Sequence, residues 1–179
     1  MPPIVKTSSA EASVLRSHRW DLPHEEATQA WAEALAQQAP IKHLTLALQG
    51  PLGAGKTTFT RHLLRALGVT GRIKSPSYAI VEPYALPSRP SDPNPSMAWH
   101  FDFYRFNDPR EWEDAGFRDL FASPGLKLVE WWENAKGLMP TPDWVITLSI
   151  VNEASRELMI QAYSSEGASL LQHMETEHP

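Results

Sequence analysis

Residues 50–57 read GPLGAGKT and match the pattern G-x-x-x-x-G-K-[ST] at every fixed position. Before this motif, residues 41–48 (IKHLTLAL) predict a buried strand. After it, apolar residues recur at helical spacing from Thr57 to Leu67, and Gly68 is a signal for the helix to end. The sequence therefore predicts a strand, a glycine-rich loop and a helix in direct succession.

This order of elements suits the binding of a polyphosphate. Glycines let backbone N–H groups close around phosphate oxygens, and the helix N-terminus adds the positive end of its dipole. Lys56 is placed to reach the β- and γ-phosphates, and the Thr57 hydroxyl to ligate Mg²⁺. The motif arises by chance in about one per cent or fewer of chains of this length. The predicted nucleotide-binding residues are Gly50, Pro51, Leu52, Gly53, Ala54, Gly55, Lys56, Thr57 and Thr58.

The composition is typical of a globular protein, with 42% hydrophobic and 21% charged residues. The absence of cysteine excludes disulfides and thiolate metal sites. No apolar run approaches the roughly 18 residues of a membrane span, and the N-terminal residues show no signal-peptide pattern. These features predict a cytoplasmic protein without membrane contact.

The net charge of −5 argues against an autonomous nucleic-acid binder, so no contact with DNA is expected. The basic residues are nevertheless concentrated, because residues 34–81 contain no Asp or Glu. Two interpretations stay open: a positive field around a polyphosphate that is shared with RNA, or a solvated helix face. The basic residues of this stretch are Lys42, Lys56, Arg61, Arg65, Arg72 and Lys74.

The organisation of the chain predicts one P-loop domain over residues 13–165. Residues 1–12 are expected to be disordered, and residues 166–179 to form a tail or a short helix. The proline- and serine-rich stretch 85–96 predicts a surface loop. Strands and helices alternate around the P-loop, and strands dominate after it. We therefore expect the α/β class and a P-loop NTPase fold, with a mixed sheet that is parallel in its centre, antiparallel at its edges and flanked by helices.

Periodicity and start signals predict further elements. Pro23 is expected in the first turn of a helix over residues 23–38, and Asp108 is expected to cap a helix over residues 108–115. A hairpin is expected near the end of the domain. The predicted strands lie at residues 14–20, 78–84, 97–106, 126–131, 144–151 and 157–164.

Two carboxylates stand where a nucleotide-hydrolysing site needs them. Hydrolysis requires a carboxylate in the Mg²⁺ shell and a group that orients the attacking water. Asp102 ends an apolar run, and Glu130 closes the apolar strand that begins at Leu126. Either residue is also compatible with an ordinary solvent-facing position at a strand end. His100, two residues before Asp102, is expected to be a strand residue rather than a metal ligand.

Four motifs occur in order: GPLGAGKTTFTR at 50–61, KSPSYAIVEPY at 74–84, HFDFYR at 100–105 and LVEW at 128–131. Together they closely resemble the bacterial TsaE (YjeE) family, over residues 22–160. The resemblance implies an ATPase that uses ATP and Mg²⁺ in the tRNA threonylcarbamoyladenosine pathway. It also implies partnership with TsaB and TsaD, which modify the adenosine beside the anticodon, with tRNA contacted through that complex.

The resemblance also implies roles for single residues. Lys56, Asp102 and Glu130 would be catalytic, and Thr57, Asp102 and Glu130 would hold the metal. Trp131 would lie beside the nucleotide, while Thr28 and Arg156 would approach its base or sugar. A switch-like loop near the γ-phosphate would be formed by Ser75, Pro76, Ser77 and Tyr78.

The sequence departs from the family pattern at two positions. Ser77 stands where threonine is usual, which preserves the hydroxyl. Trp132 stands where proline usually follows the tryptophan of LVEW, which affects the expected backbone path after Trp131. The loop at 85–96 is also long for its position.

Two other functions remain alternatives. A small-molecule P-loop kinase would need a clustered basic lid, for which Arg105, Arg110 and Arg118 are a poor substitute. A nucleotide-gated binding module would have no meaningful turnover of its own. A GTPase is disfavoured, since the guanine-reading pattern N-K-x-D does not occur.

Overall fold

The computed structural model describes residues 12–76, 78–88 and 93–178. The expected disorder of residues 1–12 therefore falls almost wholly outside the described residues. Ser77 and part of the predicted 85–96 loop lie outside them as well.

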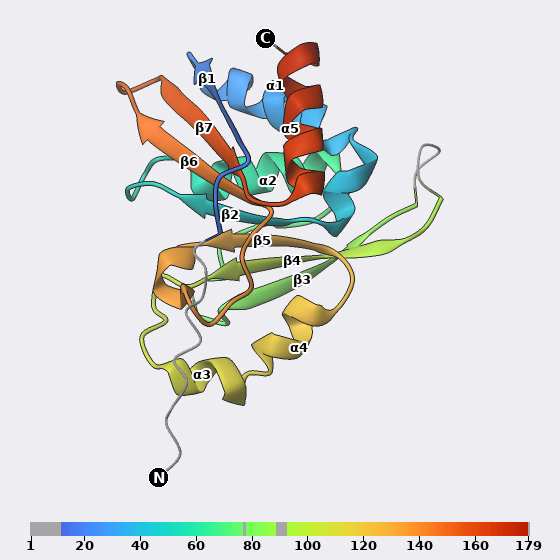
Figure 1. The fold of residues 1–179 in the computed structure, drawn as a ribbon, viewed down its shortest axis with the longest axis vertical. Helices are drawn as coiled ribbons and strands as arrows, with labels where there is room; N and C mark the ends of the chain where they lie inside the picture. The colour runs from blue at the N-terminus through green and yellow to red at the C-terminus, as the bar shows by residue number, and fades with distance from the viewer. Residues whose placement is uncertain (1–11, 77, 89–92, 179) are drawn as a thin grey trace.

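A mixed sheet forms the middle layer of the molecule (Figure 1). Its strands within the described residues are β1 (Arg16–Leu22), β2 (Thr45–Gln49), β3 (Val81–Leu86), β4 (Ser96–Asp102), β5 (Leu126–Glu130), β6 (Trp144–Ile150) and β7 (Arg156–Ala162). They lie in the order β1-β7-β6-β2-β5-β4-β3. The central neighbours β6–β2, β2–β5 and β5–β4 pair in parallel, and the outer pairs are antiparallel. The predicted fold class is confirmed.

Helices cover both faces of this sheet. Three of them share a hydrophobic core on one face: α1 (Glu25–Ala36), α2 (Lys56–Ala66) and α5 (Ser165–Glu177). Two short ones pack on the other face: α3 (Pro109–Asp114) and α4 (Phe117–Ala122). Two 3₁₀ helices complete the described elements, η1 (Ala39–His43) and η2 (Trp132–Ala135).

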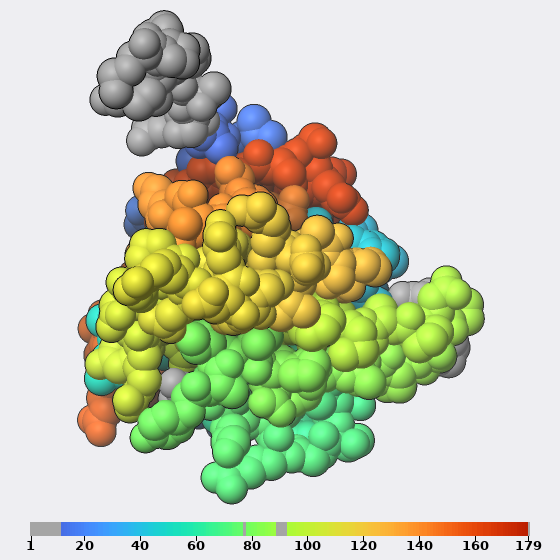
Figure 2. Space-filling view, turned by 90° about the horizontal axis from the view of Figure 1, so that it is seen from below, coloured from blue at the N-terminus to red at the C-terminus, as the bar shows by residue number. Residues whose placement is uncertain are grey.

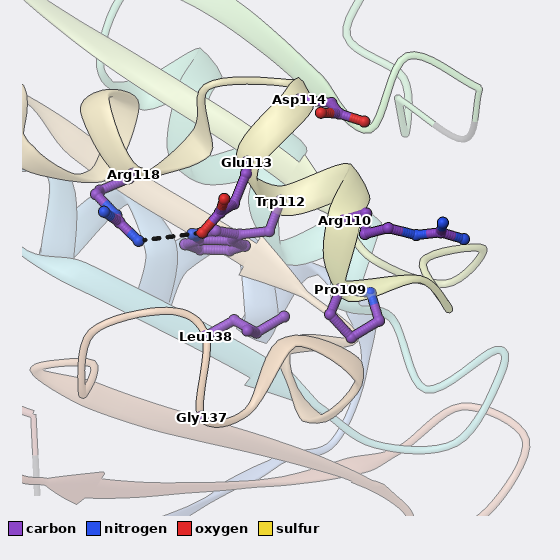
Figure 3. Close-up of a pocket in the computed structure, with 8 residues that line it drawn as sticks. All are labelled: Pro109, Arg110, Trp112, Glu113, Asp114, Arg118, Gly137 and Leu138. Carbon is purple, nitrogen blue, oxygen red and sulfur yellow. Dashed lines mark hydrogen bonds and ion pairs between the residues drawn. The ribbon is translucent and has the colours of Figure 1, made fainter.

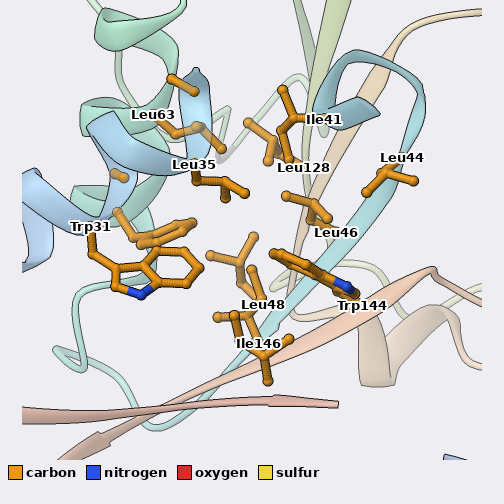
Figure 4. Packing of buried hydrophobic residues seen from close by; sticks show 14 of the residues in the cluster. Trp31, Leu35, Ile41, Leu44, Leu46, Leu48, Leu63, Leu128, Trp144 and Ile146 are labelled. Carbon is orange, nitrogen blue, oxygen red and sulfur yellow. The ribbon is translucent and has the colours of Figure 1, made fainter. Parts of the chain in front are cut away.

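The larger core lies between the sheet and the α1, α2 and α5 helices, and Figure 4 shows the part of it that contains Trp31, Leu63 and Trp144. Alternate residues of the parallel strands point into it, among them Leu48 and Ile146. The ring of Trp31 on α1 lies 5.9 Å from that of Phe59 on α2 and 6.5 Å from that of Trp144 on β6. Each fully buried large apolar side chain contributes about 1.5–3 kcal/mol. This packing fixes α2 on the sheet and thereby fixes the glycine loop that precedes it.

An aromatic core fills the opposite face, under α3 and α4. Phe101 and Phe121 stack with ring centroids 4.7 Å apart, and Phe103 meets Phe117 edge to face at 5.7 Å. Figure 2 shows the α3–α4 segment (yellow) as an outer cover of the molecule on this side. Since Phe101 and Phe103 face this core, Asp102 between them faces the α2 side.

The predicted strand over residues 41–48 is wrong in its first half. Pro40 lies in the first turn of η1, and the Leu44 N–H donates to the Ile41 carbonyl at 3.3 Å. The chain therefore turns before the strand β2 begins at Thr45. A proline fixes φ near the helical value and removes a donor from any ladder, which explains the difference.

Two other strands have different ends from those predicted. The strand expected over residues 97–106 ends at Asp102, because its side chain accepts a bond from the Tyr104 N–H at 3.0 Å and turns the chain. The strand expected from residue 78 starts at Val81, since Ile80 has a positive φ of 63°. The β3–β4 pairing then continues to Leu86 and Ser96, so the predicted loop at 85–96 is shorter at both ends.

The helices also differ from the predictions in detail. Pro23 lies outside α1, whose cap is His24, and the helix ends at Ala36. The predicted Asp108 cap of α3 is confirmed, since its carboxylate accepts from the Arg110 N–H. Neither α4 nor η2 was predicted. The C-terminal α5 runs for 13 residues and buries Leu171 in the larger core, so it packs as part of the same domain.

Candidate functional site at the glycine loop

The glycine-rich loop connects the carboxyl end of β2 to the first turn of α2. Two glycines are required by its path: Gly50 has φ 140°, and a Cβ there would overlap the Leu148 carbonyl oxygen. Gly55 precedes α2 with φ 103° in the left-handed region. Within the described residues, no side chain caps this helix. The N–H groups of its first turn therefore remain available at the loop.

Lys56 is the buried cation of the loop. Its Nζ donates to the carbonyls of Gly50 at 2.7 Å and Pro51 at 3.1 Å. The same Nζ lies 4.2 Å from the centroid of the Trp131 ring. Burial lowers the pKa of Lys56, and the carboxylates of Glu130, Glu133 and Asp102 act in the opposite direction. The loop thus holds a partly desolvated positive charge at its centre.

The two predicted carboxylates lie side by side beneath the start of α2. Asp102 of β4 and Glu130 of β5 are partners in the parallel register. They are 6% and 2% exposed, although carboxylates are rarely buried without partners. Glu130 Oε2 accepts a hydrogen bond from Thr57 Oγ1 at 2.9 Å. Because parallel strands end at one edge of the sheet, two acidic groups and a hydroxyl converge there.

The switch-like segment contacts this acidic pair. Ser75 Oγ donates to Asp102 Oδ2, and the Pro76 carbonyl accepts from the Ile80 N–H at 2.9 Å. Tyr78 is exposed, and the Arg105 guanidinium lies 4.7 Å from its ring centroid. The expectation for Ser77 lies outside the described residues. The segment is therefore tied to the acidic pair through the Asp102 carboxylate.

Trp131 follows Glu130 in a left-handed conformation, with φ 55° and ψ 36°. Such values are uncommon for a bulky residue and occur where a site constrains the backbone. Its ring lies 5.0 Å from the Tyr104 ring and faces Lys56. Trp132 is the first residue of η2, and its Nε1 donates to Gln49 Oε1 at 3.1 Å.

Thr28 and Arg156 lie on the other side of the loop. Arg156 Nε donates to the Ala54 carbonyl at 3.1 Å, and its Nη2 contacts the Gly53 carbonyl at 3.4 Å. Thr28 of α1 is 7% exposed and lines the same hollow. The structure thus brings both residues to the loop, on the flank away from the acidic pair.

Two hollows of about 420 and 350 Å³ meet at the loop and share Gly53, Gly55 and Thr58. The first contains the acidic pair, and the second contains Thr28 and Arg156. We call them together the trough. A separate hollow of about 470 Å³ lies between α3, α4 and the residues after η2 (Figure 3). It shares no lining residue with the trough.

Several residues of the trough were not predicted from the sequence. Tyr104 lines the acidic hollow, and His24 and Glu25 line the other. His100 is a strand residue, as expected, but its Nε2 also lies 2.8 Å from Glu130 Oε1. The sequence feature that could have placed His100 near the acidic pair is its position two residues before Asp102, which puts both side chains on the same face of the strand.

A parallel-centred sheet, a glycine loop that leads into a helix, and carboxylates at the neighbouring strand ends define a P-loop protein. The comparison with protein families goes further. The model of a family described as "Threonylcarbamoyl adenosine biosynthesis protein TsaE" matches residues 22–158. The chain belongs to the TsaE family, and the resemblance seen in the four motifs is confirmed.

Individual relatives agree with this assignment. A Haemophilus influenzae protein named "tRNA threonylcarbamoyladenosine biosynthesis protein TsaE" is 36% identical over 141 residues, which cover 79% of this chain and 84% of that protein. A Bacillus subtilis protein of the same name is 30% identical, over 89% of this chain and 95% of the relative. The crystal structure of Bacillus subtilis YdiB superposes with a TM-score of 0.69 at 25% identity, covering 92% of this chain and 97% of that one.

None of the helices in the described residues is long and apolar enough to cross a bilayer.

Proposed function

We propose that this protein binds ATP and Mg²⁺ in the trough and hydrolyses the nucleotide for tRNA threonylcarbamoyladenosine biosynthesis. The observation that carries the proposal is the bond from Thr57 to Glu130 beside Asp102, directly after the glycine loop. It brings the motif hydroxyl and two carboxylates to the phosphate-binding end of α2. The pathway is proposed from the names of the relatives and of the family.

The loop has the chemistry of a phosphate site. The uncapped N-terminus of α2 offers backbone N–H donors and the positive end of a helix dipole. Lys56 adds a full positive charge that is partly shielded from water. We infer that its Nζ moves from the Gly50 and Pro51 carbonyls to the β- and γ-phosphates when nucleotide binds.

The donor set beside the loop suits Mg²⁺. Thr57, Asp102 and Glu130 offer hard oxygen ligands, which Mg²⁺ prefers to nitrogen or sulfur. The described residues contain no cluster of three or more His, Cys, Asp or Glu side chains that would hold a metal alone. This fits a metal that shares its shell with phosphates and water. Bound there, Mg²⁺ would neutralise charge that develops on the transferring phosphate.

The acidic pair has separable tasks in this proposal. Glu130 presents Oε2 toward Thr57, where it would ligate Mg²⁺, directly or through a water, or position the attacking water. Asp102 divides its oxygens between Ser75 and the Tyr104 N–H, so it links the metal side to the switch-like segment. A change at the phosphates would therefore reach that segment through Asp102.

The trough offers little positive charge for the transition state. Arg156 is engaged with the Gly53 and Ala54 carbonyls, and Arg105 lies over the exposed ring of Tyr78. An arginine supplied by a partner raises turnover by about 10³–10⁵ in other P-loop enzymes. We therefore propose that TsaD and TsaB complete the site, and that tRNA is contacted through them. The cytoplasmic location stays a prediction.

The test is phosphate release from Mg·ATP by the purified protein, alone and then with TsaB, TsaD and tRNA. Slow release alone and a rise of at least 10-fold with partners is the expected result. Release that stays slow and unchanged would contradict an ATPase completed by partners. It would favour a nucleotide-gated module, or a small-molecule kinase whose acceptor is absent from the assay.

A further inference from the structure

A buried histidine contacts Glu130 of the acidic pair. His100 on β4 is 0% exposed, and its Nε2 lies 2.8 Å from Glu130 Oε1. Its Nδ1 has no hydrogen-bond partner among the described residues. In the parallel register His100 pairs with Leu128, and Asp102 with Glu130. His100 therefore lies one step deeper than the acidic pair, on the same face of the sheet.

The chemistry of this contact assigns its direction. An ionised carboxylate only accepts hydrogen bonds, so the hydrogen must lie on Nε2 and His100 donates. Glu130 then has a different donor for each oxygen: Oε1 receives from His100, and Oε2 receives from Thr57. The terminal torsion of a glutamate is otherwise broad and poorly defined. The histidine thus fixes the orientation of the carboxylate, with one oxygen toward the core and the other toward Thr57.

We propose that His100 is a positioning residue, which holds Oε1 of Glu130 so that Oε2 is presented to Thr57 and to Mg²⁺. The inference rests on the proposed function of the trough. Without this donor, the carboxylate would keep its burial but lose one of its two side-chain partners. It would then be free to turn away from the metal position. Loss of such an outer-shell partner costs about 10–100-fold in metal affinity or activity.

The measurement is the affinity for a non-hydrolysable ATP analogue by calorimetry, once in EDTA and once at saturating Mg²⁺. The ratio of the two affinities reports the metal contribution and needs no turnover. His100→Leu removes the donor, whereas His100→Gln keeps an amide nitrogen close to the place of Nε2. Thr60→Val is the matched control, since it replaces another buried polar side chain on the same side of the sheet, whose Oγ1 has no bond among the described residues.

We expect His100→Leu to reduce the Mg²⁺ enhancement by about 10–100-fold, while the affinity in EDTA stays within about twofold of wild type. His100→Gln should recover most of the enhancement, and Thr60→Val should retain it. In a Glu130→Gln background, His100→Leu should add little, because the two side chains act as one unit. Equal losses with and without Mg²⁺, or no recovery in His100→Gln, would overturn the positioning role.

This experiment separates a failure of the proposed function from a failure of the role of His100. If the wild-type protein does not bind the analogue, or binds it with an affinity that is independent of Mg²⁺, the proposed function is overturned and the role of His100 with it. A wild-type protein with normal enhancement and an unaffected His100→Leu variant would overturn the role of His100 alone.

Discussion

The two flanks of the trough are built in opposite ways. The acidic flank (Thr57, Asp102 and Glu130) combines two carboxylates at the ends of parallel strands with a hydroxyl from the first turn of α2, and Thr57 bonds to Glu130. The arginine flank (Thr28 and Arg156) stands on α1 and the antiparallel β6–β7 hairpin, and Arg156 bonds to backbone carbonyls of the loop. The acidic flank contains two buried carboxylates, whereas the arginine flank supports the backbone of the loop through Arg156.

This difference predicts a division of labour. Buried carboxylates with fixed partners are suited to holding a metal and a water at defined positions. A side chain that bonds to the backbone of a loop holds its conformation, and this conformation affects the affinity of the loop for a ligand. Substitutions on the acidic flank should therefore change turnover and metal dependence, and those on the arginine flank should change affinity.

Lys56 lies between the flanks, and its loss should have the largest effect. Lys56→Ala would remove the charge-assisted contact proposed for the β- and γ-phosphates, worth about 3 kcal/mol, so ATP affinity should fall by about 100-fold. Calorimetry with the non-hydrolysable analogue measures this change. Arg118→Ala removes an exposed charge on α4 and serves as the control. Unchanged ATP affinity in a folded Lys56→Ala protein would contradict the proposal that ATP binds at the glycine loop.

Glu130→Gln tests the acidic flank. The amide keeps the size of the side chain but loses the charge, so turnover should fall by about 100-fold or more. ATP affinity should change by less than the turnover does. The measurement compares kcat with the binding constant in the presence of the partners. Equal loss of both would make Glu130 a binding or folding residue and would erase the difference between the flanks.

Arg156→Ala tests the arginine flank and should have a smaller effect. The loop loses its bonds at Gly53 and Ala54, so we expect ATP affinity to fall by about 10-fold with kcat little changed at saturation. Arg19→Ala is the control, because Arg19 pairs with the neighbouring Glu157 at the surface. A fall in kcat as large as that of Glu130→Gln would contradict the division.

The sequence predicted some parts of the trough and missed others. The glycine loop, Asp102 and Glu130 were readable because a local motif and strand ends mark them. The contact from His100 to Glu130 depends on which strands are neighbours and in which register, and no local pattern contains that information. The contact from Arg156 to Ala54 likewise joins residues that are 102 positions apart.

The missed boundaries have a similar cause. The turn at Asp102 depends on a side chain that bonds to the backbone, and the left-handed Trp131 depends on its packing against Tyr104 and Lys56. Neither changes the apolar pattern from which a strand is predicted. Both lie in the trough, where function and backbone regularity compete.

The smallest effect is expected far from the trough. Arg16 of β1 donates to Glu175 of α5 at 2.6 and 2.8 Å, and this hydrogen bonding lowers the pKa of Glu175. The ionised pair therefore stabilises the fold above the ordinary glutamate pKa, and this contribution is lost as pH falls through the lowered value. Glu175→Gln should reduce the fall in melting temperature that accompanies acidification, without changing ATP affinity. An unchanged dependence of the melting temperature on acid pH would contradict this prediction. An altered ATP affinity would mean that the trough extends beyond its two flanks.

The most direct test of the account is a crystal structure with Mg²⁺ and a non-hydrolysable ATP analogue. We predict the phosphates on residues 50–57, with Mg²⁺ at the Thr57 hydroxyl beside Asp102 and Glu130. The base or sugar should lie toward Thr28 and Arg156. A nucleotide bound in the hollow between α3 and α4, or a metal away from the acidic flank, would contradict the central claim.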